Sequence, residues 1–540
     1  MASASYSTDP LRRPGWPRQY VLPLLLVLLL GLGYALLGSQ LFHEGFCAKV
    51  MLYLGEKALL AHEGKPPRLE NMGFVNPPLP HFFALLLKSP FAATGFVGGA
   101  IATSLLLVVL RQYRTGRISL PLLLVLCGYI TVSPLSLFLF SQQMPTALLI
   151  ALLLLIYYHL FMYCRHDVSY NLFLFGLLSA MVFLTEFQAI LLIPLFTFSL
   201  VSRVIALRPL RSMGVLMTGL FPVVFISLAW CYLNWIFLGD PFHFISYWRS
   251  ALEPLLSFPE NMEQTRTLGG AFFAGLRLCR QNLPLLLPYL LLFPWLLCKD
   301  GALGCSVTGA ILLAPPLLLY IQLATNFVVL NQFFLLIFVA TAVAVRILRH
   351  DHCKGALFSR AFTLAMLISF GASCLPPQPQ QQAEEHLFSR LLLGRPSPGN
   401  LAHYRQLLAQ LEPDGLILLD DTVNYPLVYL VNDPKRFILP YEYEFDTALS
   451  APHLFARYLV ASELASTDMV QGRYPLAPLG LVPGFTLRGR FGDLVLYEVT
   501  QRPQTLPLLR LGAQREKTGG CSDEHQLRIA VHDADAASRR

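Results

Sequence analysis

Two adjacent ionisable residues, His43 and Glu44, stand directly after the first long apolar run of the chain. Poor solvation beside an apolar surface suits a carboxylate to abstract a proton from a hydroxyl nucleophile. A histidine can carry a proton, bind a metal or hydrogen-bond a phosphate. The alternative is that both residues only mark the end of an interfacial helix. We take Glu44 and His43 as the candidate catalytic residues.

Further polar residues near the same predicted membrane boundary are candidates for substrate binding. The cationic ones could bind an anionic headgroup, although long basic side chains also make ordinary contacts with lipid headgroups. Glu186 lies between two apolar runs, where an ionisable group indicates function by default, and its alternative is the cap of a short turn. The candidate substrate-binding residues are Lys49, Arg68, Asn76, Lys88, Glu186 and Arg249.

The composition indicates a polytopic membrane protein. Of 540 residues, 55% are hydrophobic and only 13% are charged, against about a quarter charged in soluble domains. The net charge of +8 is spread over short segments between apolar runs and forms no basic patch, which argues against nucleic-acid binding. The ten cysteines include no CxxC, so neither a disulfide framework nor a zinc site is expected. The chain has no Walker A loop, dinucleotide-binding glycine motif or HExxH.

Eleven apolar runs predict the elements that position these residues. The expected fold class is mainly α, a polytopic membrane helical bundle of about eleven transmembrane helices. Basic connecting segments place the N-terminal tail, 1–19, in the cytoplasm and loops 41–88 and 238–281 outside. The predicted spans are 20–40, 89–110, 119–140, 146–163, 171–186, 188–203, 213–237, 282–298, 303–323, 327–346 and 360–376.

The first outside loop has its own helical pattern. Apolar residues recur at three- and four-residue spacings from Phe42 to Ala58, and charged residues fall largely between them. This pattern predicts an amphipathic helix lying in the membrane interface, and Pro66-Pro67 ends it.

The composition changes after the last predicted span. Residues 377–390 read as a polar, proline-rich linker, and 391–504 predict a small extracytoplasmic α/β domain. Within it, Asp420-Asp421 follows a buried strand, and turn chemistry is favoured there over a metal or substrate pair. Residues 505–540 are polar and predict a disordered tail.

The order of these features resembles the GT-C superfamily of membrane glycosyltransferases, with a closer likeness to the branch of the aminoarabinose transferases and protein O-mannosyltransferases. That branch has an Asp-Glu pair after the first span, then an amphipathic stretch and a PPL element. Here the pair stands as His43-Glu44 and the PPL element as Pro77-Pro78-Leu79, and the segment N234-W-I-F-L-G-D-P-F242 is similar to a recurrent stretch near the seventh span.

The resemblance implies transfer of a sugar from a polyprenyl-phosphate donor to a glycan, lipid or protein acceptor on the outer face of the cytoplasmic membrane. A first-loop carboxylate would be the base, and cations would stabilise the phosphate leaving group. No cofactor is certain, and a divalent metal stays open because the outside loops carry no DxD. Because His43 replaces the usual Asp, the chain either uses Glu44 or is a non-catalytic subunit for assembly or export of a cell-surface polysaccharide, with other envelope-biosynthesis subunits as partners.

Overall fold

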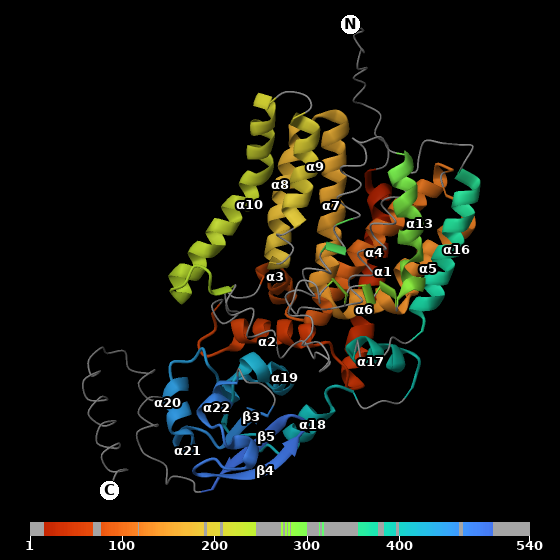
Figure 1. Ribbon diagram of the computed structural model, residues 1–540. Coiled ribbons are helices and arrows are strands. Elements are labelled where there is room, and N and C mark those ends of the chain that lie inside the picture. Colours follow the sequence, from red (N-terminus) through yellow and green to blue (C-terminus); the bar gives the residue numbers. More distant parts are fainter. Residues whose placement is uncertain are drawn as a thin grey trace.

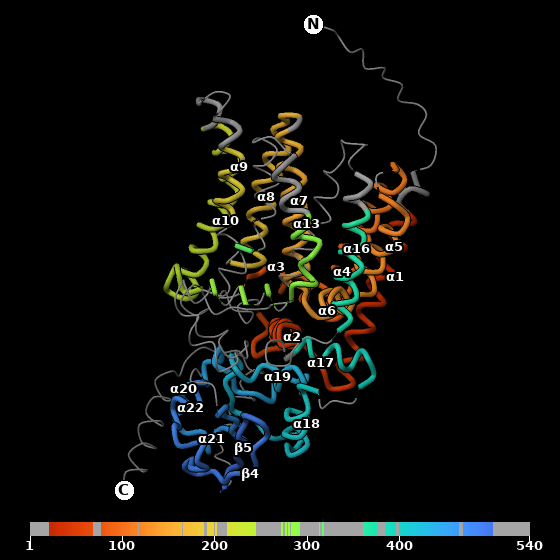
Figure 2. The backbone as a smooth tube through the Cα atoms, turned by 45° about the vertical axis from the view of Figure 1, so that its right-hand side comes forward, coloured from red at the N-terminus to blue at the C-terminus, as the bar shows by residue number. Residues whose placement is uncertain are grey.

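The computed structural model shows a mostly helical chain with a small C-terminal sheet (Figure 1). Long apolar helices stand side by side, and the α/β domain lies at one end of them. Helix α2 runs across that end, between the upright helices and the sheet, in both views (Figures 1 and 2). The structure describes residues 16–68, 77–116, 118–187, 192–205, 209–244, 272–273, 276–277, 279–280, 282–299, 313, 316–317, 355–375, 383–395, 399–463 and 468–500.

The upright helices follow the predicted apolar runs closely. Four helical stretches are long and apolar enough to cross a membrane, and a fifth if the bent pair α5–α6 counts as one span. The count of eleven stays a prediction, because α8 and α16 are shorter and the runs at 303–323 and 327–346 fall almost wholly outside the described residues. The helices are α1 (Trp16–His43), α4 (Pro90–Arg114), α5 (Leu120–Val132), α6 (Pro134–Gln142), α7 (Met144–His166), α8 (Ser169–Thr185), α9 (Ile193–Ile205), α10 (Pro209–Leu238), α13 (Leu283–Lys299) and α16 (Gly355–Ser373).

Helices α1 and α4 approach each other more closely than any bulky side chain would allow. A Cβ atom on Gly95 would lie 2.5 Å from the carbonyl oxygen of Gly31, and one on Gly99 would lie 2.5 Å from the Gly31 nitrogen. Small residues four apart let helix backbones pack directly, which replaces the hydrophobic driving force that is missing between helices in lipid. The sequence therefore fixes α1 against α4, and with it the position of the first loop.

We expect Gly99→Ala to destabilise this pair by about 1–3 kcal/mol, because the added methyl group meets backbone atoms of α1 that cannot rotate away. Gly33→Ala is the matched control, since a Cβ there has nothing within 4 Å. Thermal unfolding in detergent should show a lower midpoint for Gly99→Ala than for Gly33→Ala. Equal midpoints would contradict the close packing.

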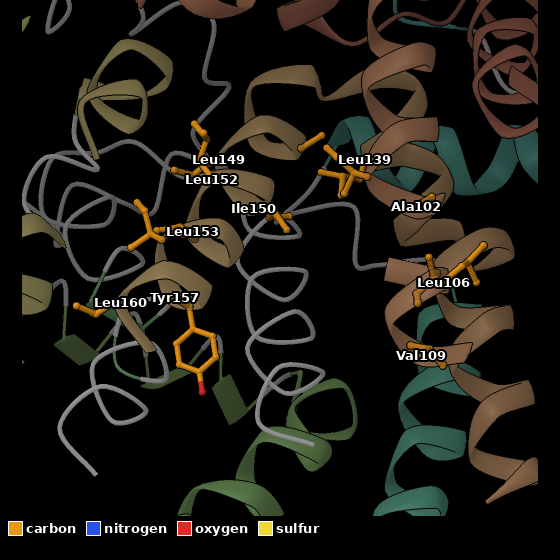
Figure 3. Close-up of a cluster of buried hydrophobic side chains, with 14 of the residues drawn as sticks. Ala102, Leu106, Val109, Leu139, Leu149, Ile150, Leu152, Leu153, Tyr157 and Leu160 are labelled. Carbon is orange, nitrogen blue, oxygen red and sulfur yellow. The ribbon is translucent and has the colours of Figure 1, made fainter. Parts of the chain in front are cut away.

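The largest buried core joins α4, α6 and α7. Ala102, Leu106 and Val109 of α4 face this core, as Figure 3 shows. Leu139 of α6 faces it too, with the α7 residues Leu149, Ile150, Leu152, Leu153, Tyr157 and Leu160. Side chains four residues apart on one helix point to the same face, so these spacings form a continuous apolar stripe. The core holds the upright helices as one unit beneath the first loop.

The first loop contains two helices where the sequence predicted one. Helix α2 (Lys49–Glu63) matches the amphipathic pattern. Helix α3 (Pro78–Leu87) starts at the PPL element and ends where Lys88 adopts a left-handed backbone conformation. Ser89 then caps α4 by accepting a hydrogen bond from the Ala92 amide, and Pro90 is the first residue of α4. The predicted boundary between the loop and the second span, at Lys88, therefore matches the end of α3, and α3 itself is the helix that was not predicted.

The C-terminal part forms the predicted α/β domain. Its five-stranded sheet has the order β2-β1-β3-β5-β4. Strand β1 (Ile417–Leu418) pairs in parallel with β2 (Phe437–Ile438) and with β3 (Tyr458–Ser462). Strand β5 (Leu494–Val499) runs antiparallel to β3 and to β4 (Phe485–Phe491). The helices and 3₁₀ turns are α17 (Ala383–Leu392), α18 (Ala402–Leu408), α19 (Asp421–Val431), η4 (Pro434–Arg436), α20 (Phe445–Ser450), α21 (Pro452–Phe455), α22 (Met469–Arg473) and η5 (Ala477–Leu479).

Apolar clusters cover both faces of strands β1, β2, β3 and β5, and helix α2 contributes to one of these clusters. Successive residues of a strand point to opposite faces of the sheet, and they belong here to two separate apolar clusters, one on each face. One cluster includes Leu407 of α18, Leu427 of α19 and Leu60 of α2. Helix α2 is therefore part of the core of the α/β domain.

The segment predicted as a linker, 377–390, includes most of α17, whose bounds are Ala383–Leu392. Buried Phe388 on α17 contacts Phe46 and Phe138, with ring centroids 6.0 and 5.1 Å away. The predicted tail 505–540 lies outside the described residues.

Candidate functional site

Glu44 lies at the end of α1 that faces the α/β domain. Its side chain is exposed and accepts a hydrogen bond of 3.1 Å from the Gln40 amide. His43, the last residue of α1, is also exposed. The α3–α4 turn lies beside them, because the ring of Phe42 contacts that of Phe91 at 5.4 Å. The exposed carboxylate of Glu44 thus lies where the apolar helices end and the α/β domain begins.

The turn after Glu44 is held by side chains from distant parts of the chain. The Asn400 amide accepts a hydrogen bond from the Cys47 nitrogen at 3.1 Å and donates one to the Cys47 carbonyl at 2.6 Å. Arg405 donates to the carbonyl oxygens of His43 and Phe42 at 3.2 and 2.6 Å. A cation at the C-terminal end of α1 satisfies carbonyls that the helix leaves open and complements its dipole.

Two more side chains bond the backbone where α2 begins. Gln142, at the end of α6, accepts from the Ala48 amide at 3.1 Å. Glu384 of α17 accepts from the Lys49 amide at 3.0 Å. Burial raises the pKa of Glu384, and the nearby charge of Lys49 opposes that rise. The turn from Phe42 to Lys49 is therefore a junction between the apolar bundle and the C-terminal part.

The structure describes four of the predicted substrate-binding residues, Lys49, Arg68, Lys88 and Glu186, and they lie at separate places. Lys49 begins α2, and Arg68 follows its far end, where its guanidinium lies 5.6 Å from the ring centre of Tyr443. A helix of this length spans about 20 Å at 1.5 Å per residue, so Lys49 and Arg68 cannot serve one phosphate. Lys88 is exposed at the α3–α4 turn, and Glu186 is the C-cap residue of α8. Asn76 and Arg249 lie outside the described residues.

A buried ionic cluster that sequence reasoning missed joins α2 to the α/β domain. The Lys57 ammonium lies 2.5 Å from Oδ2 of Asp421 in α19 and 3.3 Å from Oε2 of Glu56. All three residues are buried, and Glu56 has no exposed surface. Asp421 follows Asp420, whose side chain accepts from the Thr422 amide as the N-cap of α19. The expected turn role is thus confirmed for Asp420, while Asp421 instead pairs with Lys57.

Burial and neighbouring charge act in opposite directions on this cluster. Burial raises the pKa of Glu56 well above its usual range, and the charge of Lys57 offsets that rise only in part. Burial by itself lowers the pKa of Lys57, but Asp421 and Glu56 outweigh it, so the pKa of Lys57 is raised. The raised pKa values favour the protonated, neutral form of Glu56 and the charged form of Lys57.

Aromatic and amide side chains complete the α2–α19 contact. The ring of Tyr53 meets that of Tyr425 edge-on at 5.4 Å, and the Lys57 ammonium lies 5.4 Å from the Tyr53 ring centre. A Cβ atom on Gly55 would lie 2.5 Å from the ring of Tyr429, so only glycine fits there. Asn424, buried on α19, has both side-chain polar atoms without a hydrogen-bond partner. The contact is tight and polar at once.

One sequence signal did point to this cluster. Glu56-Lys57 is a charged pair flanked on both sides by apolar residues, in Y-L-G-E-K-A-L-L. An amphipathic pattern assigns such a pair to solvent, but here the polar face of α2 is covered by the α/β domain. No local spacing could identify Asp421 as the partner, because it lies 364 residues further along the chain.

The described residues hold no group of three or more His, Cys, Asp or Glu side chains placed to bind a metal ion. Among known proteins, no family model matches the sequence, and no curated protein matches it.

Proposed function

We propose that the chain is a membrane glycosyltransferase that moves a sugar from a polyprenyl-phosphate donor to a glycan, lipid or protein acceptor outside the cytoplasmic membrane. The observation that supports it best is the position of Glu44, an exposed carboxylate at the end of the first long apolar helix. A donor whose lipid tail lies among apolar helices presents its phosphate and sugar at this level. An acceptor approaching from the aqueous side would meet the carboxylate there.

The proposed chemistry needs a base and a cation on one face. A hydroxyl acceptor is a weak nucleophile, so Glu44 takes its proton as the new glycosidic bond forms. Negative charge builds on the departing phosphate, and a nearby cation stabilises it. Exposed Lys88 suits this part, because its turn lies beside the end of α1 through the Phe42–Phe91 contact.

The membrane arrangement is part of the same proposal. Helix α4 has Arg111 and Arg114 in its last turn. The C-terminal end of α4 lies at the opposite end of the bundle from the α/β domain (Figure 1). The excess of basic residues at that end favours the cytoplasm for it. The first loop and the α/β domain would then share the outer face.

The proposal predicts sugar transfer by membranes that contain the protein. Such membranes, supplied with radiolabelled polyprenyl-phosphate sugars, should move label into a polar or lipid acceptor fraction. Membranes from the same cells without the protein are the control. No transfer above that control, from any donor of a panel of polyprenyl-phosphate sugars, would favour the second candidate.

That second candidate is a non-catalytic subunit for assembly or export of a surface polysaccharide. One observation favours it: the backbone of the turn from Phe42 to Lys49 is bonded by Asn400, Arg405 and Glu384, which makes the first loop a docking surface. A docking role alone would not need Glu44 to be a carboxylate.

A further inference from the structure

Three contacts of different kind hold the α/β domain on helix α2. Gly55 accepts the ring of Tyr429, Tyr53 meets Tyr425, and Lys57 pairs with Asp421. The first two are shape contacts that are indifferent to pH. The third is ionic and buried, so it depends on the charges around it.

We propose that Glu56, Lys57 and Asp421 form a proton-sensitive clamp, which holds the α/β domain tightly on α2 while Glu56 is neutral and loosens when Glu56 ionises. With Glu56 protonated, the cluster holds one cation and one anion and is electrically balanced. Loss of that proton would leave two carboxylates and one ammonium in a largely buried place. An uncompensated charge in such a place is unfavourable, and separating α19 from α2 would relieve it by letting water in.

The geometry of the sheet makes this place sensitive. Chain connections leave β1 towards β2 and return to β3 on its other side, so β1 and β3 flank the point where the strand order reverses. Open α/β sheets bind their ligands outside the carboxyl ends of strands at such a point. Asp420 and Asp421 follow β1 there, and α2 of the first loop packs on the helix that they begin. The clamp therefore occupies the position where a sheet of this kind would hold a ligand.

The pH effect of Glu56 must be distinguished from that of the other titratable and charged groups on the elements around α2. Helix α4 faces α2 with Ala93 and Thr94, which do not titrate. The groups on the remaining elements are Tyr53 on α2, His81 on α3, Asp421, Tyr425 and Tyr429 on α19, Lys435 and Arg436 on η4, and Tyr441 and Glu442 after β2.

Glu442 is the main competitor for the role. Burial raises its pKa to about 7, and Lys65 opposes that rise. Glu442 therefore titrates near neutral pH. It has no ion pair with Lys57 among the described contacts, so the two carboxyls can be told apart by substitution.

The direction of the pH effect follows from the raised pKa of Glu56. Above its ordinary value of 4.5, the docked state keeps a proton that a separated, solvated Glu56 would lose. Docking is therefore strongest at low pH and weakens as pH rises, until the pKa of the docked state is passed. One proton changes the docking equilibrium by up to about tenfold per pH unit.

Hydrogen exchange of the full-length protein in detergent tests the clamp. After correction for the intrinsic effect of pH on exchange, the protection of amides in α2 and α19 should fall by about tenfold or more between pH 6 and pH 8. Amides in β3 and β5 should show no such change. Glu56→Gln keeps the shape and stays neutral, so its protection in α2 and α19 should be high and independent of pH.

Two further variants keep the test decisive. Glu442→Gln should retain the wild-type dependence on pH. In Asp421→Asn, Glu56 becomes the only anion beside Lys57 and ionises readily, so the dependence between pH 6 and pH 8 should vanish. The proposal is overturned if wild-type protection is independent of pH, if Glu56→Gln or Asp421→Asn keeps the wild-type dependence, or if Glu442→Gln abolishes it.

Discussion

Replacing Glu44 with glutamine is expected to lower the rate of sugar transfer by about 10²–10⁴-fold, the usual contribution of a positioned general base. The amide keeps the size of the side chain and can still bond Gln40, so the end of α1 should be unchanged. The loss should appear in kcat with little change in donor binding, because the carboxylate acts only while the acceptor loses its proton.

Glu63→Gln is the matched control for that experiment. Glu63 is also an exposed acid of the first loop, at the last position of α2, and the proposed mechanism gives it no role. Both variants and the wild type would be assayed in the same membranes at equal protein levels. Wild-type rates for Glu44→Gln would rule out Glu44 as the base, and an equal loss in Glu63→Gln would show a general effect of loop charge.

Replacing Lys57 with methionine is expected to destabilise the docked protein by about 3–5 kcal/mol. The change removes the cation that faces Asp421 at 2.5 Å and leaves that carboxylate buried next to another acid. Methionine retains most of the volume of lysine, so the loss arises from charge rather than from a cavity. The unfolding midpoint in detergent should fall, and exchange of the α19 amides should rise.

The double variant Lys57→Met/Asp421→Asn separates charge from packing. Because it removes both members of the ion pair, it should be more stable than Lys57→Met alone, since a neutral buried pair is often tolerated where a single buried charge is not. Lys435→Met, at an exposed lysine of η4, is the control for loss of one positive charge. A double variant as unstable as the sum of the single variants would show that the two residues do not interact.

Hydropathy predicted the upright helices well because each of them is apolar along most of its length, whether its side chains face the core or the outside of the bundle. Runs 89–110 and 146–163 became α4 and α7 with small extensions. Run 119–140 was one predicted span, yet Pro134 starts a second helix and α5 and α6 meet with a bend of 40°. Hydropathy measures the summed preference for lipid, and it does not register a single proline at which the hydrogen-bond ladder restarts.

The α/β domain shows where local pattern is insufficient. The alternating residues 493–499 are typical of a strand, and β5 lies there, whereas most residues of β4 face solvent and carry no apolar pattern. The apolar residues 425–431 are part of α19, and their pattern alone does not distinguish a helix from a strand. For the site, the sequence placed Glu44 at a helix end correctly, but the pairing of Lys57 with Asp421 depends on tertiary contact alone.

The long reach of the first-loop contacts sets an order of events during synthesis. Cys47 and Asn400 are 353 residues apart, and Lys57 and Asp421 are 364 apart. At about 5–20 residues per second, α2 waits roughly 20–70 s at the ribosome before its partners exist. Throughout that interval Glu56 and Lys57 have only each other and the solvent. The first loop is thus synthesised early, but it gains its contacts with the α/β domain only near the end of synthesis. A chain truncated before the α/β domain never gains these contacts, and cellular quality control can detect that state.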